Sequence, residues 1–181
     1  MQKIAIIGQQ CSGKSTAAKI IDDHYENALV KFADPIYTAL HGLGKQKHRA
    51  FMQAFGDLAK VYFGEMVFVE AFEKTVKSIE RCCHDEINLD HGFIVCDDVR
   101  RSYEAKKCKE LGFKIIYIDT PVEVRRARAD ALGLAFIENH NSETEVPELR
   151  RYADIVLDGS VCLGTFQNAI LNLCRLWKHS A

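Results

Sequence analysis

With 181 residues, 48% of them hydrophobic, the chain has the size of one folding unit and can bury a substantial apolar core. Its 24 lysine and arginine residues nearly balance its 25 aspartate and glutamate residues, so it lacks the global basic field that binds nucleic acid regardless of sequence. We expect no nucleic-acid partner and, because no apolar run reaches membrane-spanning length, no membrane.

The first predicted element is a strand that runs into a loop of small residues. The apolar run 4–7 precedes residues 8–15, GQQCSGKS, and the helix-favouring stretch 16–21 follows. This is a G-x-x-x-x-G-K-S motif with the strand before it and the helix after it that the motif requires. An ordinary glycine-rich turn is the alternative, but this context favours a site for a nucleoside triphosphate.

The chemistry of the loop supports that interpretation. Small residues let backbone N–H groups surround a phosphate, the helix start adds positive dipole, and Lys14 supplies a mobile charge. Ser15 offers a hydroxyl ligand to magnesium. The residues expected to bind the triphosphate are Gly8, Gln10, Cys11, Ser12, Gly13, Lys14, Ser15 and Thr16.

The cysteines and the N-terminus indicate the compartment. Seven cysteines are an odd number, and apart from Cys82 and Cys83 they occur singly, as expected for reduced thiols. A zinc site drawn from Cys82, Cys83, His84, His91 and Cys96 lacks the usual ligand spacings and is not favoured. The first strand has no basic, apolar leader before it. We expect a soluble, unexported, cytoplasmic protein, in the host-cell cytoplasm if a phage encodes it.

A second strand is predicted over 28–32, and it ends at Ala33-Asp34-Pro35. Asp34 is expected to cap the following helix, with Pro35 in its first turn. Such a junction falls at the carboxyl edge of a parallel sheet, where ligands bind in open α/β folds.

The next segment, 36–84, carries no strand signal of comparable strength. Apolar residues such as Phe51, Phe55 and Leu58 recur at helical spacing, and breaks are predicted near Gly44 and Gly64. We expect a helical insertion over about 34–85, suited to a small substrate-holding subdomain. A plain crossover with extra turns would show a similar pattern.

The third predicted strand, 92–98, is apolar on both faces and therefore central, and it ends in Asp97 and Asp98. A carboxylate at that place can hold magnesium beside the phosphates on Lys14. Capping of the next helix and pairing with Arg100 and Arg101 are the structural alternatives. The phosphate loop favours the magnesium role for one of the two aspartates.

The remaining elements continue the alternation of strand and helix. A helix over 102–111 stops at Gly112, a strand covers 113–119, and another helix opens at Thr120-Pro121. A fifth strand over 153–157 and a closing helix from Leu163 to about Lys178 complete the chain. The pattern predicts an α/β fold with a five-stranded, mostly parallel sheet in three layers and right-handed crossovers.

The helix after Thr120 carries three arginines, Arg125, Arg126 and Arg128, just before a polar stretch that ends near Pro147. A solvated helix face is the usual explanation of such a run. The polar stretch could close as a lid, and guanidinium groups suit the charge that develops on a transferring phosphoryl group. We therefore favour phosphate contact.

Several short motifs, in this order and spacing, resemble the phage-type deoxynucleoside monophosphate kinases, within the nucleoside monophosphate kinase group of P-loop proteins. Beyond the phosphate loop they are Phe32-Ala33-Asp34-Pro35, Gln53-Ala54-Phe55-Gly56-Asp57, Asp98-Val99-Arg100 with Glu104, and His140-Asn141-Ser142-Glu143 ahead of Ile155-Val156-Leu157-Asp158-Gly159. The resemblance covers nearly the whole chain. It departs from the family pattern at Lys60, where an arginine is usual, and at Phe68, where a tryptophan is common. Lysine meets a phosphate only as a point charge, without the two-pronged geometry of arginine.

The resemblance implies a three-layer P-loop kinase fold with an NMP-binding insertion at about 34–85 and a short lid at about 126–147. It further implies transfer of the γ-phosphoryl of ATP, with Mg²⁺, to the 5′-phosphate of a deoxynucleoside monophosphate, giving ADP and a deoxynucleoside diphosphate. The implied catalytic residues are Lys14, Arg100, Arg125 and Arg128, with Arg126 also on ATP. The implied acceptor-binding residues are Asp34, Gln53, Gly56, Lys60, Arg100, His140 and Glu143. Magnesium would be bound by Ser15 and one of two aspartates. The position at the strand end indicates Asp97, whereas the family's Asp-Val-Arg motif indicates Asp98.

Other functions stay open at the level of the sequence. The acceptor could be dephospho-coenzyme A or another small phosphorylated metabolite, because the phosphate loop does not specify the group phosphorylated. A nucleotide-dependent switch or partner-binding module is a third alternative. The accepted bases, the preference for deoxyribose, and the choice between monomer and homodimer are also left open.

Overall fold

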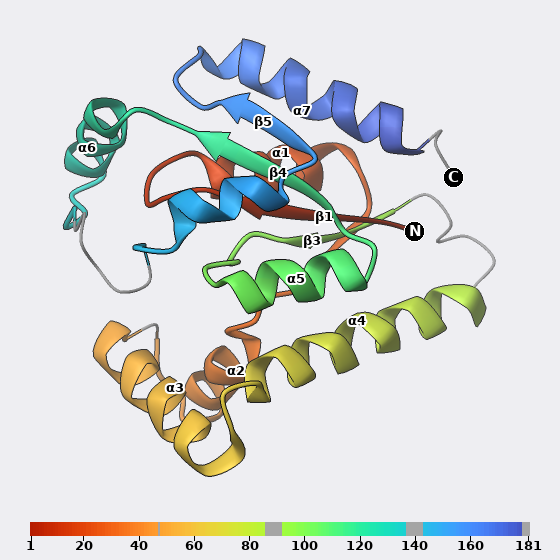
Figure 1. The fold of residues 1–181 in the computed structure, drawn as a ribbon, viewed down its shortest axis with the longest axis vertical. Helices are drawn as coiled ribbons and strands as arrows, with labels where there is room; N and C mark the ends of the chain where they lie inside the picture. Colours follow the sequence, from red (N-terminus) through yellow and green to blue (C-terminus); the bar gives the residue numbers. More distant parts are fainter. Residues whose placement is uncertain (47, 86–91, 137–142, 179–181) are drawn as a thin grey trace.

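Five strands form one sheet in the computed structural model, which describes residues 1–46, 48–85, 92–136 and 143–178 (Figure 1). The strands are β1 (Gln2–Ile7), β2 (Asn27–Leu29), β3 (Phe93–Cys96), β4 (Lys114–Asp119) and β5 (Ile155–Asp158). Their order across the sheet is β2-β3-β1-β4-β5, and every neighbouring pair is parallel. The prediction of a five-stranded, mostly parallel sheet is confirmed, and parallel pairing extends to all five described strands.

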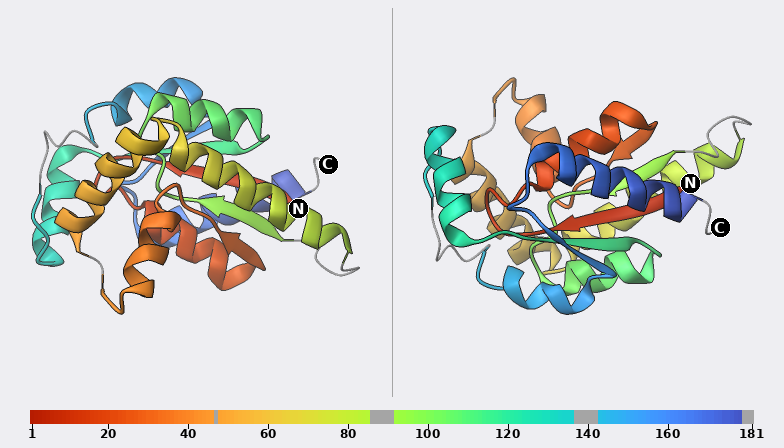
Figure 2. Two further views of the ribbon diagram at one scale, coloured as in Figure 1. Left: turned by 90° about the horizontal axis from the view of Figure 1, so that it is seen from below. Right: turned by 90° about the horizontal axis from the view of Figure 1, so that it is seen from above.

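Helices cover both faces of this sheet. They are α1 (Lys14–His24), α2 (Asp34–Gly42), α3 (Arg49–Phe63), α4 (Val67–Asp85), α5 (Ser102–Glu110), α6 (Val122–Ala131), the 3-10 helix η1 (Val146–Tyr152) and α7 (Leu163–Lys178). Figure 1 shows α7 above the sheet, α5 and α4 below it, and α6 beyond the end at which β1 and β4 terminate. The two views of Figure 2 show the same layers from below and from above.

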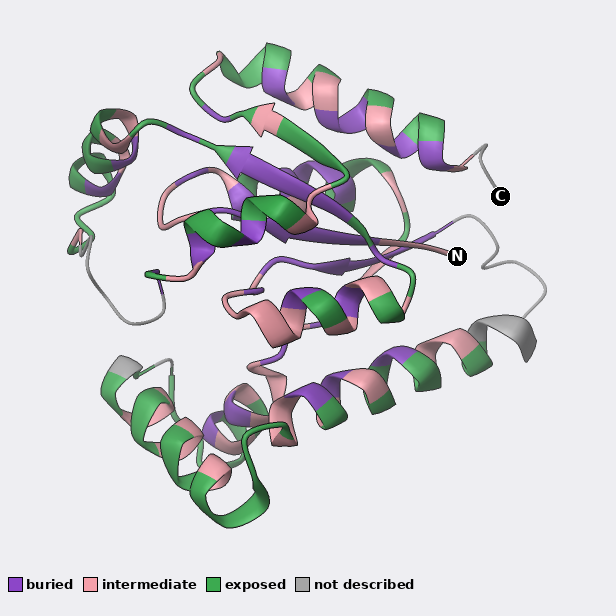
Figure 3. Ribbon diagram, in the orientation of Figure 1, coloured by how far each residue is buried: buried purple, intermediate pink, exposed green. Residues whose placement is uncertain are grey.

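The side chains of β1 alternate between two apolar clusters, as the two-residue period of a strand requires. Ile4 and Ile6 pack with residues of α1 and α7, whereas Ala5 and Ile7 pack with residues of α4, α5 and η1. In Figure 3 the buried colour follows the central strands and the inner faces of these helices. Burial on both faces explains why the central strands are continuous apolar runs in the sequence.

Strand β2 is shorter than predicted and ends at Leu29 instead of residue 32. The N–H of Val30 still donates to Val95 O at 2.8 Å. The next N–H group that could extend the ladder, that of Phe32, instead donates to the carboxylate of Asp98 at 3.1 Å, and the N–H of Ala33 donates to the same carboxylate at 3.0 Å. A side chain thus captures a backbone donor of a longer strand.

Asp34 does not cap α2 as predicted. It is the first residue of that helix, Ala33 occupies the cap position, and no side-chain cap is made. The Asp34 carboxylate turns back and accepts the N–H of Lys31 at 2.7 Å. Asp34 therefore stabilises the turn that leads into the helix, and Pro35 lies in the first turn as predicted.

Three helices occupy the described part of the segment between β2 and β3, as the helical spacing predicts. The breaks between them lie at Gly44 and Gly64, whose φ angles are +64° and +93°. Figure 1 shows α2 and α3 set apart from the sheet and α4 returning beneath α5. The ring of Phe72 on α4 stacks on Phe32 with centroids 4.0 Å apart. The insertion is helical as predicted, and its role in holding an acceptor stays a prediction.

Among the described residues, no helix combines the length and the apolar character needed to cross a membrane.

Candidate active site

The phosphate loop joins the end of β1 to the start of α1. A Cβ on Gly8 would lie 2.4 Å from Ser12 Oγ and 2.9 Å from Ile118 O, and Gly13 has a φ of +113°. Only glycine fits the first position without moving the backbone of β4, and only glycine adopts the second without strain. The two fixed glycines of the motif thus let the chain turn tightly into the N-terminus of α1, the arrangement that binds anions.

Cys11, at the tip of the same loop, has a φ of +58° and is the one non-glycine residue with positive φ in the described ranges. The left-handed region costs a side-chain-bearing residue about 1–2 kcal/mol. The phosphate loop therefore stores local strain at Cys11.

Replacing Cys11 with glycine is expected to stabilise the protein by about 0.5–1 kcal/mol, the relief of this strain less the entropy of a more flexible unfolded chain. For a chain of this size that corresponds to a rise in Tm of about 2 °C. Thermal unfolding checks it, with Cys11→Ala as the control, because alanine keeps the strained φ. An equal gain in Cys11→Ala would show that the thiol, not the backbone, is the source.

Lys14 begins α1 and folds back onto the loop. Its Nζ donates to Gly8 O at 2.7 Å and to Gln9 O at 2.8 Å, and the side chain is buried. Burial, and then the positive charge of Arg100, lower the pKa of Lys14 to about 7. Glu143 and Asp97 act in the opposite direction. The lysine is held in a place where a negatively charged ligand would restore its full charge.

The two aspartates that follow β3 face different surroundings. Asp97 is buried, and its Oδ1 lies 2.9 Å from Lys31 Nζ. Asp98 accepts the N–H groups of Phe32 and Ala33. Burial raises the pKa of Asp98, and the two backbone hydrogen bonds oppose that rise. Asp98 thus holds the backbone after β2. Asp97, in contrast, lies close enough to Lys14 for its negative charge to raise the pKa of that lysine.

Neither structural alternative for these aspartates is realised. The arginines that follow them pair with other carboxylates, Arg100 with Glu143 and Arg101 with Glu145. The start of α5 is held by Glu104, which accepts the N–H groups of Arg100 at 2.6 Å and Arg101 at 3.0 Å. Burial raises the pKa of Glu104 to about 7, and those two backbone hydrogen bonds oppose it.

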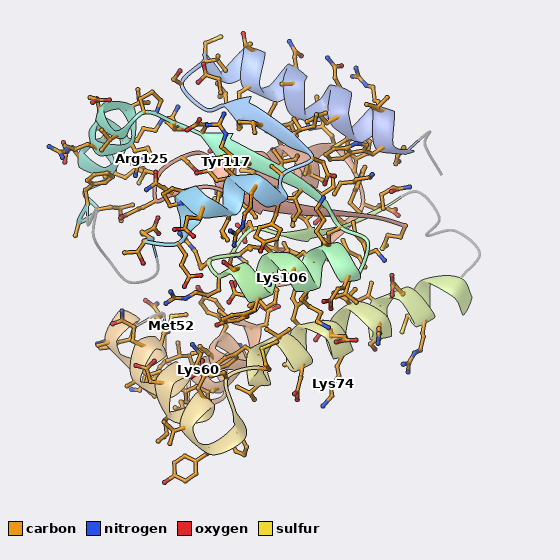
Figure 4. The ribbon with its side chains drawn as sticks, viewed as in Figure 1. Met52, Lys60, Lys74, Lys106, Tyr117 and Arg125 are labelled. Carbon is orange, nitrogen blue, oxygen red and sulfur yellow. The ribbon has the colours of Figure 1, made fainter. Side chains whose placement is uncertain are left out.

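The three arginines of α6 have separate environments. Arg125 is buried, donates from Nε to Thr120 O at 3.1 Å, and lies 5.4 Å from the centroid of the Phe136 ring. Arg126 lies 5.6 Å from the same ring. Arg125 is labelled in Figure 4, at the end of the molecule that carries α6.

Arg128 contacts the phosphate loop itself. Its Nη1 lies 3.4 Å from Cys11 O and 3.3 Å from Ser12 O, and its Nη2 donates to Gly159 O at 2.7 Å. A Cβ on Gly159 would lie 2.7 Å from Ser12 O, so the turn after β5 can approach the phosphate loop only because residue 159 is glycine. Arg128 therefore ties the phosphate loop to that turn.

Known proteins resemble the chain in both sequence and structure. No protein-family model matches it. A protein of Acanthamoeba polyphaga mimivirus described as "Putative deoxynucleotide monophosphate kinase" is 27% identical over 202 residues, covering 95% of each chain. Shikimate kinase from Aquifex aeolicus superposes with a TM-score of 0.53 at 16% identity, covering 99% of this chain and 100% of that one. Shikimate kinase from Acinetobacter baumannii superposes with a TM-score of 0.51 at 15% identity, covering 97% and 94%.

The chain has the P-loop kinase fold. The predicted fold class is thereby confirmed. The similarity to the mimivirus protein likewise confirms the resemblance to deoxynucleotide monophosphate kinases that the motifs indicate.

Within this P-loop kinase fold, the acceptor-side predictions fall on α3 and on the segment before η1. Gln53 is exposed on α3, Gly56 packs near Ile36, and Lys60 Nζ lies 3.9 Å from Glu65 Oε2. Lys60 is labelled in Figure 4 on α3. His140 lies outside the described residues. The binding roles of all these residues stay predictions.

Sequence reasoning missed Lys31. It is half-buried beside Asp97. Burial alone would lower the pKa of Lys31, but the hydrogen bond to Asp97 and the negative charge of Asp97 outweigh that effect and raise it. The available signal was a charged residue near the carboxyl end of an otherwise apolar strand. The same signal identified Asp97, because the ends of neighbouring parallel strands meet at one edge of the sheet.

Proposed function

We propose that the chain is an ATP-dependent kinase of deoxynucleoside monophosphates, transferring the γ-phosphoryl of ATP to the 5′-phosphate of the acceptor. The observation that carries the proposal is the convergence of Lys14, Asp97 and Arg100 at the carboxyl edge of the sheet, beside the phosphate loop. The name of the mimivirus relative supports the choice of acceptor.

The donor triphosphate is assigned to the phosphate loop. Its backbone N–H groups and the start of α1 would hold the phosphates, and Lys14 would leave the carbonyl groups of Gly8 and Gln9 to contact them. Arg128 keeps the loop in shape from its carbonyl side. Arg125 and Arg126 would act at the donor side from α6, with Arg125 fixed by its bond to Thr120 O.

Magnesium is assigned to Ser15 and Asp97. A hydroxyl and a single carboxylate suit this ion, which keeps several waters and otherwise binds substrate phosphates. Magnesium would neutralise charge on the transferring phosphoryl group. Asp98 is the weaker candidate because its oxygens already accept two backbone N–H groups.

The acceptor is assigned to the region between Arg100 and the helical insertion. Its guanidinium would bind the acceptor 5′-phosphate, with Asp34, Gln53, Gly56 and Lys60 on the insertion towards the nucleoside. Transfer of this kind needs positioning and charge neutralisation more than a covalent nucleophile.

Coupled ADP release with ATP and magnesium tests the proposal. The acceptor panel comprises deoxynucleoside and nucleoside monophosphates, dephospho-coenzyme A, shikimate and a control without acceptor. We expect strong stimulation by at least one deoxynucleoside monophosphate. Stimulation by another acceptor alone would replace the substrate, and slow release that no acceptor stimulates would contradict the kinase reaction.

Binding of magnesium-saturated ATP is expected to take up a proton above pH 7. The free protein loses the Lys14 proton as pH rises through about 7, whereas bound phosphates hold Lys14 charged to much higher pH. Uptake should approach about one proton at pH 8.5, and affinity should fall as pH rises through that window, by up to about tenfold per unit.

Calorimetric titrations in two buffers of different ionisation enthalpy measure this uptake. The same pair of titrations at pH 6 is the control, since Lys14 is then already charged and uptake should be close to zero. Equal values at the two pH settings would rule out Lys14 as the titrating group.

A further inference from the structure

Glu143 connects the phosphate loop to Arg100. Its side chain is 7% exposed. Its Oε2 accepts the backbone N–H of Gln10 at 2.8 Å, and its Oε1 forms an ion pair with Nη1 of Arg100. One buried carboxylate therefore joins a group on the proposed donor side to a group on the proposed acceptor side.

The backbone around this bridge is also fixed. Gln10 donates from its side chain to Ala135 O at 2.8 Å, so it holds the chain at both residue 135 and residue 143. On the opposite side, the N–H of Arg100 is held by Glu104 at 2.6 Å. Arg100 is thus tied at its backbone by one carboxylate and at its guanidinium by another.

The charges explain why a carboxylate is needed there. Arg100 lowers the pKa of Lys14, which means that the two cations repel each other, and Glu143 acts on Lys14 in the opposite sense. Glu143 therefore offsets the repulsion that would push Arg100 away from the phosphate loop. The ion pair uses Nη1 of Arg100, and a guanidinium has five N–H donors in all, so donors remain for a phosphate.

We propose that Glu143 is a positioning residue, which holds the Arg100 guanidinium beside the phosphate loop so that an acceptor phosphate on Arg100 lies in line with the donor. The inference rests on the proposed function. It assigns Glu143 a role through Arg100, in place of the direct contact with the acceptor that the resemblance implies.

Glu143→Ala is expected to lower kcat by about 10- to 100-fold and to raise the KM for the acceptor, because a displacement of about 1 Å costs this much. The KM for ATP should stay within about twofold, since the phosphate loop keeps its glycines and Lys14. Glu143→Gln keeps an oxygen for the Gln10 N–H and loses the charge, so its kcat should fall between those of wild type and Glu143→Ala.

Glu145→Ala is the matched control. Glu145 lies two residues further on, accepts from Arg101 Nη1 at 2.8 Å and from the N–H of Ser102 at 3.2 Å, and so ties the same segment to the neighbouring arginine. It should lower the Tm without changing the acceptor KM by more than about twofold. A general structural role of the segment would instead change the kinetics of both variants.

A double-mutant cycle separates positioning from a direct role. If Glu143 acts only through Arg100, then Arg100→Ala combined with Glu143→Ala should have the turnover of Arg100→Ala alone. Fully additive losses would overturn the proposal. An acceptor KM that falls in Glu143→Ala would also overturn it, since the carboxylate would then compete with the phosphate for Arg100. Wild-type protein without any acceptor-dependent ADP release would refute the proposed function, and this inference with it, before any variant is compared.

Discussion

Lys14→Ala is expected to lower turnover by about 1,000-fold or more while the protein stays folded. Removal of one group that stabilises developing charge costs about 10²–10³ in kcat, and Lys14 is also the mobile charge of the phosphate loop. The fold should tolerate the change, because burial lowers the pKa of this lysine and its ammonium contributes little net stability where it lies. Coupled ADP release measures the first effect and thermal unfolding the second.

Lys19→Ala is the matched control for this prediction. Lys19 lies on the same helix, is exposed, and pairs only at 3.3 Å with Asp23 one turn further on. Its removal should leave turnover within about twofold, since an exposed pair of this kind contributes less than about 1 kcal/mol. Retained activity in Lys14→Ala would contradict every reaction that uses the phosphate loop, whichever acceptor is bound.

Most of the fold was predictable because its signals are local. The apolar runs 4–7 and 93–96 are each short, continuous and followed by polar or small residues, as expected of central parallel strands. The end of a helix was equally predictable where a single residue determines it, as at Gly112, whose φ is +79°. The errors lie where a distant side chain intervenes. β2 ends early because Asp98, 66 residues from Phe32, takes a backbone donor of the predicted strand.

The site was predictable only in part, for the same reason. The motif 8–15 encodes its own geometry, so Lys14 and its loop could be located from spacing alone. The contacts of Glu143 join residues that lie 133 positions away at Gln10 and 43 positions away at Arg100. No periodicity or turn signal links such positions. Arg128 is a similar case: its position before a polar stretch predicted phosphate contact, which stays a prediction, but gave no sign that its guanidinium contacts both Ser12 O and Gly159 O.

The contrast between Asp97 and Asp98 could not be obtained from sequence at all, because adjacent residues share every local pattern. The structure separates them by what each oxygen contacts. Asp97 lies beside Lys31 and near Lys14, whereas both oxygens of Asp98 accept backbone N–H groups. Asp97 is therefore the better candidate to hold an ion, and Asp98 supports the chain that leads into α2.

Asp97→Asn is accordingly expected to lower turnover by about 100-fold or more and to raise the magnesium concentration needed for half-maximal activity, because the amide supplies no negative charge to the ion. Its Tm should fall less than that of Asp98→Asn, because Lys31 is partly exposed and the amide oxygen can still accept from its ammonium. Activity measured across a magnesium series, at saturating ATP and acceptor, checks the prediction.

Asp98→Asn is expected to show the opposite pattern to Asp97→Asn, with lower stability and an unchanged magnesium requirement. The amide nitrogen would face one of the two N–H groups that the carboxylate now accepts, which leaves a buried donor unpaired and costs about 2 kcal/mol. For a chain of this size that lowers the Tm by about 6 °C. At temperatures where Asp98→Asn stays folded, its magnesium requirement should equal that of wild type. A raised magnesium requirement in Asp98→Asn, with a normal one in Asp97→Asn, would transfer the magnesium role to Asp98, because only a residue whose charge reaches the ion can change its apparent affinity.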